Sequence, residues 1–119
     1  MKYMLLLNRT ADALPAPGSP ELDQINKEYG AAIEAMSRAG VLIDCAPLAA
    51  RSSTTTVRVR DGETIITDGP SAEIKEQLGG YSIIECADLD EALKWAASIP
   101  AARDASVEVR PIVGGQARA

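Results

Sequence analysis

The chain has 119 residues, 46% of them hydrophobic, and a net charge of −5 from 17 acidic and 12 basic residues. This length predicts one domain over residues 1–113 with a flexible tail at 114–119, and the absence of Phe predicts an aliphatic core. Because Lys and Arg are scattered and no apolar run is long enough to span a bilayer, neither nucleic acid nor membrane is an expected partner.

The first third of the chain predicts a strand, a loop and a helix. Residues 2–8 have a continuously apolar centre, which predicts a central strand covered on both faces. The N-terminus does not have the pattern of a targeting segment, which predicts a cytoplasmic protein. The proline-rich residues 9–19 predict a loop. Ser19 as N-cap and Pro20 at the first helical position begin a helix whose apolar residues recur at helical spacing up to Gly40.

The middle of the chain predicts extended structure. Residues 41–48 form a short apolar stretch that is partly extended. Residues 53–60 alternate in polarity and residues 63–67 return as their partner, with the Asp-Gly turn typical of a hairpin between them. The following segment TDGPSAEIKEQLGGY, residues 67–81, predicts a loop with at most one turn of helix.

The last third predicts a strand, a helix and a final strand. The strand of this third is predicted over residues 80–86. Asp88 caps the helix, with Glu91 three residues later in a pattern like a capping box, and Pro100 ends it. Residues 107–110 alternate as the last strand.

These elements follow a βαββαβ order with an extra hairpin, which predicts an α+β, ferredoxin-like fold. In that fold two helices cover one face of an antiparallel sheet. The other face would still carry either Met4 and Leu6 or the residues that alternate with them, together with Ile and Val, and an apolar face without helices needs a cover. We therefore expect a homodimer that packs sheet on sheet.

Two cysteines and the absence of histidine limit the possible chemistry. Cys45 and Cys86 both lie in apolar sequence, which is typical of buried, reduced thiols. The spacings of a zinc site are missing, and we expect neither metal nor cofactor. Catalysis without histidine would depend on carboxylates, Lys, Tyr, Arg or a thiol.

The chain also resembles a known family. The combination DGP-x-A-E-x-K-E-x-L-G-G, followed by YSIIECADLDEALKWAASIP and VEVRPI, is similar to YCII-related proteins of the DGPF subgroup. The opening MKYMLLLN and the segment AGVLIDCAPL fit as well, so the resemblance covers nearly the whole chain. It implies a small bacterial cytoplasmic protein whose ferredoxin-like subunits pair into a dimeric α/β barrel. The activity of the family is largely undefined, and some related proteins are encoded beside extracytoplasmic-function sigma factors.

Two departures from this family affect its proposed chemistry. The usual Phe of the motif is Ser71 here. The wider superfamily is described with a His–Asp pair proposed to be catalytic, and this chain has no histidine. Of that pair, the Asp alone has a possible counterpart in this chain, which is Asp68.

Asp68 has a structural and a functional interpretation. Asp68, Gly69 and Pro70 together are typical turn chemistry. In the functional interpretation, the turn holds the Asp68 carboxylate rigidly at a cleft, as a general base or a cation-binding group requires.

Glu73 and Lys75 follow in the same segment and also have two interpretations. They belong either to a solvated charged loop or to a site in which Asp68 and Glu73 form an acid/base pair tuned by Lys75. The lysine would keep both carboxylates ionised, which favours binding of a cation or an amine.

Two further residues are candidates for ligand binding. Arg58, beside Arg60 on the hairpin, is either plain surface or an anion-binding group. Tyr81 either packs in the core or presents its hydroxyl to a cavity. The double glycine before it permits a bend or a close backbone approach.

The leading hypothesis is a YCII-like protein that binds an unknown small molecule, either without chemistry or as an enzyme of unassigned reaction. Asp68 and Glu73 are its candidate catalytic residues, and Lys75, Tyr81 and Arg58 its candidate ligand-binding residues. The alternative is a non-catalytic regulatory or stress-response partner that acts by protein contact, for example with an extracytoplasmic-function sigma factor. A third hypothesis is an interaction scaffold without a pocket.

Overall fold

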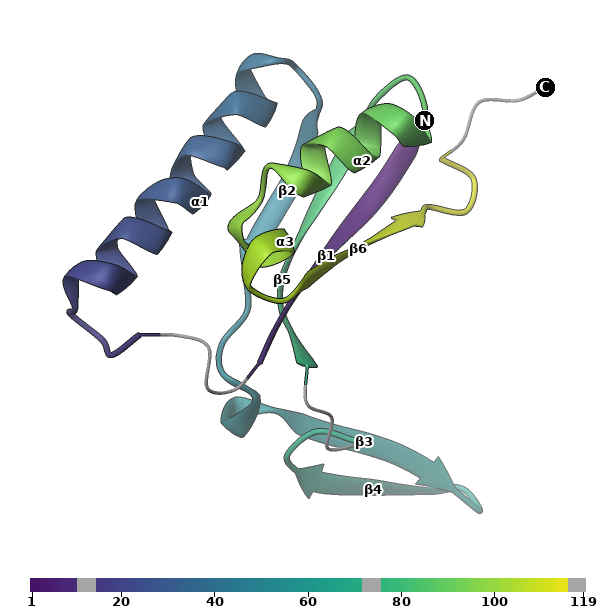
Figure 1. Ribbon diagram of the computed structural model, residues 1–119. Helices are drawn as coiled ribbons and strands as arrows, with labels where there is room; N and C mark the ends of the chain where they lie inside the picture. Colours follow the sequence, from purple (N-terminus) through teal and green to yellow (C-terminus); the bar gives the residue numbers. More distant parts are fainter. Residues whose placement is uncertain (11–14, 72–75, 116–119) are drawn as a thin grey trace.

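The structure is a computed structural model that describes residues 1–10, 15–71 and 76–115. Four strands form one antiparallel sheet in the order β2-β5-β1-β6. These strands are β1 (Lys2–Thr10), β2 (Leu42–Pro47), β5 (Glu76–Glu85) and β6 (Ser106–Pro111). The strands β3 (Thr55–Arg60) and β4 (Glu63–Asp68) form a separate hairpin that projects from one end of the molecule (Figure 1).

The helices lie on one face of the four-stranded sheet (Figure 1). They are α1 (Pro20–Arg38), α2 (Leu89–Ala97) and the short α3 (Pro100–Asp104), and a 3-10 turn, η1 (Arg51–Ser53), precedes the hairpin. One helix follows β1 and two follow β5, and β1 and β5 are the central strands. This is a mixed α+β arrangement consistent with the expected ferredoxin-like fold.

Both predicted helix caps are confirmed. The Ser19 hydroxyl accepts a hydrogen bond from the Leu22 N–H at 3.2 Å, and the Asp88 carboxylate accepts one from the Glu91 N–H at 2.9 Å. The Glu91 carboxylate reaches back to accept from the Ala87 N–H at 2.8 Å. These side chains satisfy N–H groups that have no partner within the helix, which is why short local motifs begin these helices.

The strands β1 and β5 show the largest differences from the predicted boundaries. β1 continues through Arg9 to Thr10, which were expected in a loop, and β5 begins at Glu76 instead of Gly80. The extended strands pair with each other beyond a β-bulge after Leu7, so the extra residues satisfy their backbone groups in the sheet.

Pro100 also behaves differently from the prediction. The helix α2 ends at Ala97, and Pro100 begins α3 instead of ending α2. A proline is tolerated at the start of a helix because its missing N–H would have no intrahelical acceptor there.

The core lies between the sheet and the helices and is mainly aliphatic, as expected. Leu5 of β1, Ile84 of β5 and Met36 of α1 are fully buried. Alanines of α2 and the side chain of Tyr3 complete it. Small residues on α2 allow this short helix to lie close to the strands.

The opposite face of the sheet carries none of the helices in the described ranges and is apolar at its centre. Met4 pairs with Ile83, and Leu6 pairs with Tyr81, so these side chains share the face opposite the buried Leu5. Met4, Leu6 and Ile83 are half-buried in the single chain. The expectation of a second apolar face is therefore confirmed for the central strands.

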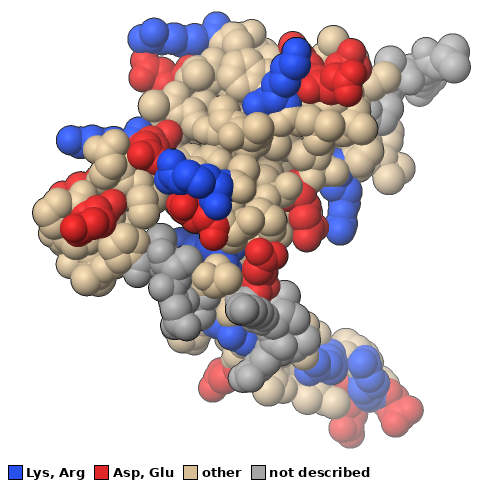
Figure 2. All heavy atoms as spheres, viewed as in Figure 1, with Lys and Arg blue, Asp and Glu red and all other residues tan. Residues whose placement is uncertain are grey.

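The β3–β4 hairpin receives little support from the rest of the chain. Its apolar residues Val57, Val59, Ile65 and Ile66 are 59%, 59%, 43% and 67% exposed. Cationic and anionic side chains mix at its far end (Figure 2). The radius of gyration is 16.4 Å, whereas a compact chain of this length has a value of about 13.5 Å. The chain is therefore less compact than a sphere-like domain of the same length.

Candidate functional site

A cavity of about 410 Å³ lies between α1 and the helix-covered face of the sheet. Pockets for small ligands commonly have volumes of roughly 300–1,000 Å³. The wall is mostly apolar and includes Leu7, Leu22, Ile25, Ile33, Met36 and Ile99. The helix α1, the sheet and the start of α3 therefore enclose a space of ligand size.

The packing of α1 explains why this space remains open. The second half of the helix buries Ala32 and Met36 against the sheet. The first half leaves Leu22, Ile25 and Tyr29 only half-buried, and all three border the cavity. The sheet thus covers only the second half of the apolar stripe of α1, and the first half faces the cavity.

The double glycine of β5 contributes to the opposite wall. A Cβ on Gly80 would stand 3.0 Å from the Ala46 carbonyl oxygen, so the glycine permits the close approach of β2. A Cβ on Gly79 would stand 2.6 Å from the Arg9 Nε, so the arginine side chain lies directly across this residue. The sequence prediction of a close approach is confirmed at Gly80.

A few polar side chains border the otherwise apolar cavity, among them Arg9, Asn26, Tyr29 and Asp104. Burial raises the pKa of the Tyr29 phenol, and the nearby Arg9 charge opposes this effect. Tyr29 is therefore a neutral hydroxyl at physiological pH. The Arg9 Nη2 donates to the Leu48 carbonyl oxygen over a long distance of 3.5 Å.

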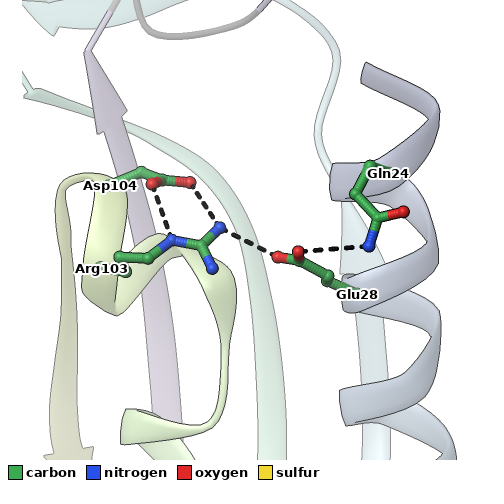
Figure 3. Close-up of polar contacts among 4 residues, drawn as sticks. All are labelled: Gln24, Glu28, Arg103 and Asp104. Atoms are coloured by element: carbon green, nitrogen blue, oxygen red, sulfur yellow. Dashed lines mark hydrogen bonds and ion pairs between the residues drawn. The ribbon is translucent and has the colours of Figure 1, made fainter. Parts of the chain in front are cut away.

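An ionic cluster connects α1 to α3 beside the cavity (Figure 3). Arg103 contacts Glu28 of α1 at 2.9 Å and Asp104 at 3.1 Å, and Gln24 donates to Glu28 at 3.5 Å. These carboxylates raise the pKa of the Arg103 guanidinium, which stays charged. The cluster holds the half of α1 that packs less tightly against the sheet.

The structure places the predicted site residues in two separate regions. Asp68 is the exposed last residue of β4, opposite Thr55. Arg58 lies in β3 and donates from Nη2 to the Ser71 carbonyl oxygen at 3.4 Å. Tyr81 lies in β5 at the cavity wall, but its side chain shares the helix-free face with Leu6. Its hydroxyl donates to the Asp44 carboxylate at 3.2 Å, and this bond raises the pKa of Tyr81.

The predicted residues do not form one cluster within the described chain. Arg58 and Asp68 belong to opposite faces of the hairpin, because Arg58 is opposite Ile65 whereas Asp68 is opposite Thr55. Of the predicted residues that the structure describes, Tyr81 alone borders the cavity. Glu73 and Lys75 lie outside the described residues.

The sequence predictions did not include Arg9, Tyr29 and Asp104, which border the cavity. Arg9 was assigned to a loop, although it directly follows residues 2–8 of the predicted first strand. Tyr29 was assigned to the apolar stripe of the helix, and a polar tip within such a stripe is the feature that indicates a cavity-facing residue. Asp104 lies in a segment without a predicted element.

Two further findings apply to the residues with described positions. No three of their His, Cys, Asp or Glu side chains gather into a group that could hold a metal ion. None of their helices combines the length and the apolar character needed to cross a membrane.

Fold and cavity together define an α+β domain with a ligand-sized space between a helix and an antiparallel sheet. The sequence model of the YCII-related domain matches residues 1–114, and the chain belongs to this family. It is 37% identical over 114 residues to uncharacterized protein R00369 of Rhizobium meliloti (strain 1021), an alignment that covers 94% of this chain and 92% of that protein.

Proposed function

We propose that this YCII-related protein binds a small, mainly aliphatic molecule in the cavity between α1 and the sheet. The cavity itself carries the proposal, because it has about 410 Å³, an apolar wall and a few polar side chains. Ligand sites typically combine an apolar lining with a small number of polar groups that orient the ligand. The aliphatic side chains of the wall suit a flexible hydrocarbon body.

Titration with 1-decanol tests this proposal. Cys45 borders the cavity, so a bound alcohol should slow its alkylation by N-ethylmaleimide and raise the Tm. Cys86 serves as an internal reference because it is buried and is not among the described residues that line the cavity. Burial also raises the pKa of its thiol. Mass spectrometry of the two cysteine peptides reports both rates in one sample.

A matched pair of variants on α1 locates the binding. Ile25→Trp places a larger side chain at the cavity wall, whereas Lys27→Trp adds the same ring at an exposed position outside the described wall. We expect Ile25→Trp to abolish the protection of Cys45 and Lys27→Trp to preserve it. The proposal would be rejected if the protection of Cys45 in the parent chain did not saturate with 1-decanol concentration. Equal protection of Cys45 in both variants would also reject it.

We also propose that two chains pair through the helix-free face of the sheet. The half-buried Met4, Leu6 and Ile83 support this arrangement, because a second sheet would remove them from water. Light scattering after size exclusion should give twice the chain mass, and Leu6→Glu should halve it. Leu93→Glu, at an exposed position of α2, should leave the mass unchanged.

A catalytic role of Asp68, together with Glu73, is retained as a separate proposal. A rigid turn supports it: the Gly69 N–H donates to the Thr54 carbonyl oxygen at 2.7 Å, and the Thr56 hydroxyl donates to the Gly69 carbonyl oxygen at 2.6 Å. Asp68→Asn should keep the Tm, whereas Gly69→Ala should lower it because Gly69 has φ +95°. A lowered Tm in Asp68→Asn would show that the carboxylate serves the turn and would reject the catalytic role.

Protein contact is the second candidate function, and the hairpin favours it. Exposed apolar side chains such as Val57 and Ile66 on an unsupported hairpin are typical of interaction surfaces. In this proposal, an extracytoplasmic-function sigma factor from the same organism, as the resemblance suggests, would bind the β3–β4 hairpin. Co-elution of the two purified proteins should be lost in the double variant Val57→Thr and Ile66→Thr and kept in Leu93→Thr. No co-elution with the parent chain would reject this function.

A further inference from the structure

Arg9 is held beside the cavity by the local backbone. It follows the bulge at which Gly79 is the extra residue of β5, because Leu7 pairs with Gly80 and Asn8 pairs with Leu78. The Arg9 side chain lies across Gly79, where a Cβ would stand 2.6 Å from Nε and 3.0 Å from Cζ. Gly79 has no side chain, and the guanidinium uses that space. The arginine is thereby placed at the cavity wall instead of extending into solvent.

The charge of Arg9 has no carboxylate partner among the described residues. Its one hydrogen bond in that part of the chain is the 3.5 Å contact from Nη2 to the Leu48 carbonyl oxygen. Asp104 is the carboxylate that borders the cavity, and Arg103 engages it through Nε at 3.1 Å and through Nη2 at 3.4 Å. As far as the described residues are concerned, most of the donors of the Arg9 guanidinium therefore remain available to a ligand.

We propose that the ligand is an amphipathic monocarboxylate whose carboxylate pairs with Arg9 while its aliphatic chain occupies the cavity. This inference rests on the proposed binding function and names its ligand class. A planar guanidinium matches the two oxygens of a carboxylate. Among the described residues of the cavity wall, Arg9 is the one cation without a carboxylate partner, and one positive charge balances one negative charge, which favours a carboxylate over a dianionic phosphate. The hydroxyl of Tyr29 adds a neutral donor beside the same cavity.

The experiment compares decanoate with 1-decanol, which has the same chain length and no charge. Isothermal titration of the parent chain should show binding of both probes, with decanoate bound about tenfold or more tightly, since hydrogen bonds to charged groups are the stronger ones. Arg9→Met keeps much of the aliphatic stem and removes the charge, and it should abolish the preference without weakening 1-decanol. Arg9→Lys should retain part of the preference.

A second variant reaches the same contact from β5. Gly79→Ala places a methyl group where the Arg9 guanidinium lies, while the backbone of Gly79 lies outside the left-handed region. We expect it to weaken decanoate severalfold and to leave 1-decanol unchanged. The Tm of each variant, measured beside the titration, identifies a variant that fails to fold, and the other variant then decides the result.

The outcomes separate this inference from the proposed function. Equal affinity for the two probes in the parent chain, or a preference that survives both Arg9→Met and Gly79→Ala, overturns the carboxylate inference and leaves the cavity as a binding site. Absence of binding by both probes overturns the proposed function and this inference together. Loss of the preference in both variants, with 1-decanol affinity intact, supports both.

Discussion

At the scale of single residues, Gly30 is a position where the sequence is not optimal for stability. It lies inside α1, and a Cβ there would meet nothing within 4 Å. Glycine in a helix interior costs roughly 0.5–1 kcal/mol relative to alanine. We expect Gly30→Ala to raise the free energy of unfolding by about that amount in urea denaturation. Gly40→Ala is the matched control, since φ +74° at Gly40 should make alanine destabilising.

Buried ionisable groups make stability depend on alkaline pH. Burial raises the pKa of Cys86 above its usual 9.0 and that of Tyr29 above its usual 10.0. Both groups keep their protons in the folded chain at a pH where the unfolded chain has lost them. Their contribution to stability is therefore complete below about pH 9 and is lost as the pH rises through the raised values.

The variant Tyr29→Phe checks this contribution. Phenylalanine cannot ionise, so the variant should lose less Tm than the parent chain between about pH 10 and pH 11. Thermal unfolding followed by circular dichroism across pH 7–11 gives both curves. Parallel curves for parent and variant would show that Tyr29 does not contribute.

At the scale of elements, local chemistry was predictable and nonlocal packing was not. The caps at Ser19 and Asp88 and the Asp-Gly turn of the hairpin depend on a few neighbouring residues, and all were predicted. The extension of β1 through Arg9 depends on pairing with Gln77, which is distant in sequence. The cavity depends on how far α1 lies from the sheet, and no local pattern encodes that distance.

The ionic cluster that ties α1 to α3 should control the mobility of one half of a helix. Arg103 alone joins Glu28 to Asp104 in this cluster (Figure 3). We expect Arg103→Ala to speed amide hydrogen exchange in residues 20–30 of α1. Residues 31–38 should keep their protection because Ala32 and Met36 remain buried.

Hydrogen exchange followed by mass spectrometry measures the two halves of α1 separately. Arg38→Ala is the matched control, since Arg38 forms its ion pair with Glu34 within the second half of α1. The control should leave residues 20–30 unchanged. Equal acceleration along the whole helix in Arg103→Ala would mean that the cluster supports α1 as one unit.

At the scale of the whole molecule, the chain is a thin plate with an attached arm. Its principal extents are 47 × 46 × 19 Å, and the short dimension corresponds to one layer of helices on one sheet. The core cluster contains no residue of β3 or β4. The hairpin is therefore a unit separate from the described core.

Removal of the hairpin tests this separation. The Thr54 carbonyl oxygen accepts a hydrogen bond from the Gly69 N–H at 2.7 Å, so a Gly-Ser linker can replace residues 55–68 without moving the ends. We expect the shortened chain to fold with a Tm within about 4 °C of the parent, the shift that roughly 1 kcal/mol produces in a small domain. A larger loss of Tm, or a failure to fold, would show that the hairpin belongs to the cooperative unit. Light scattering of the same sample should still report two chains, because the helix-free face proposed to join them is left intact.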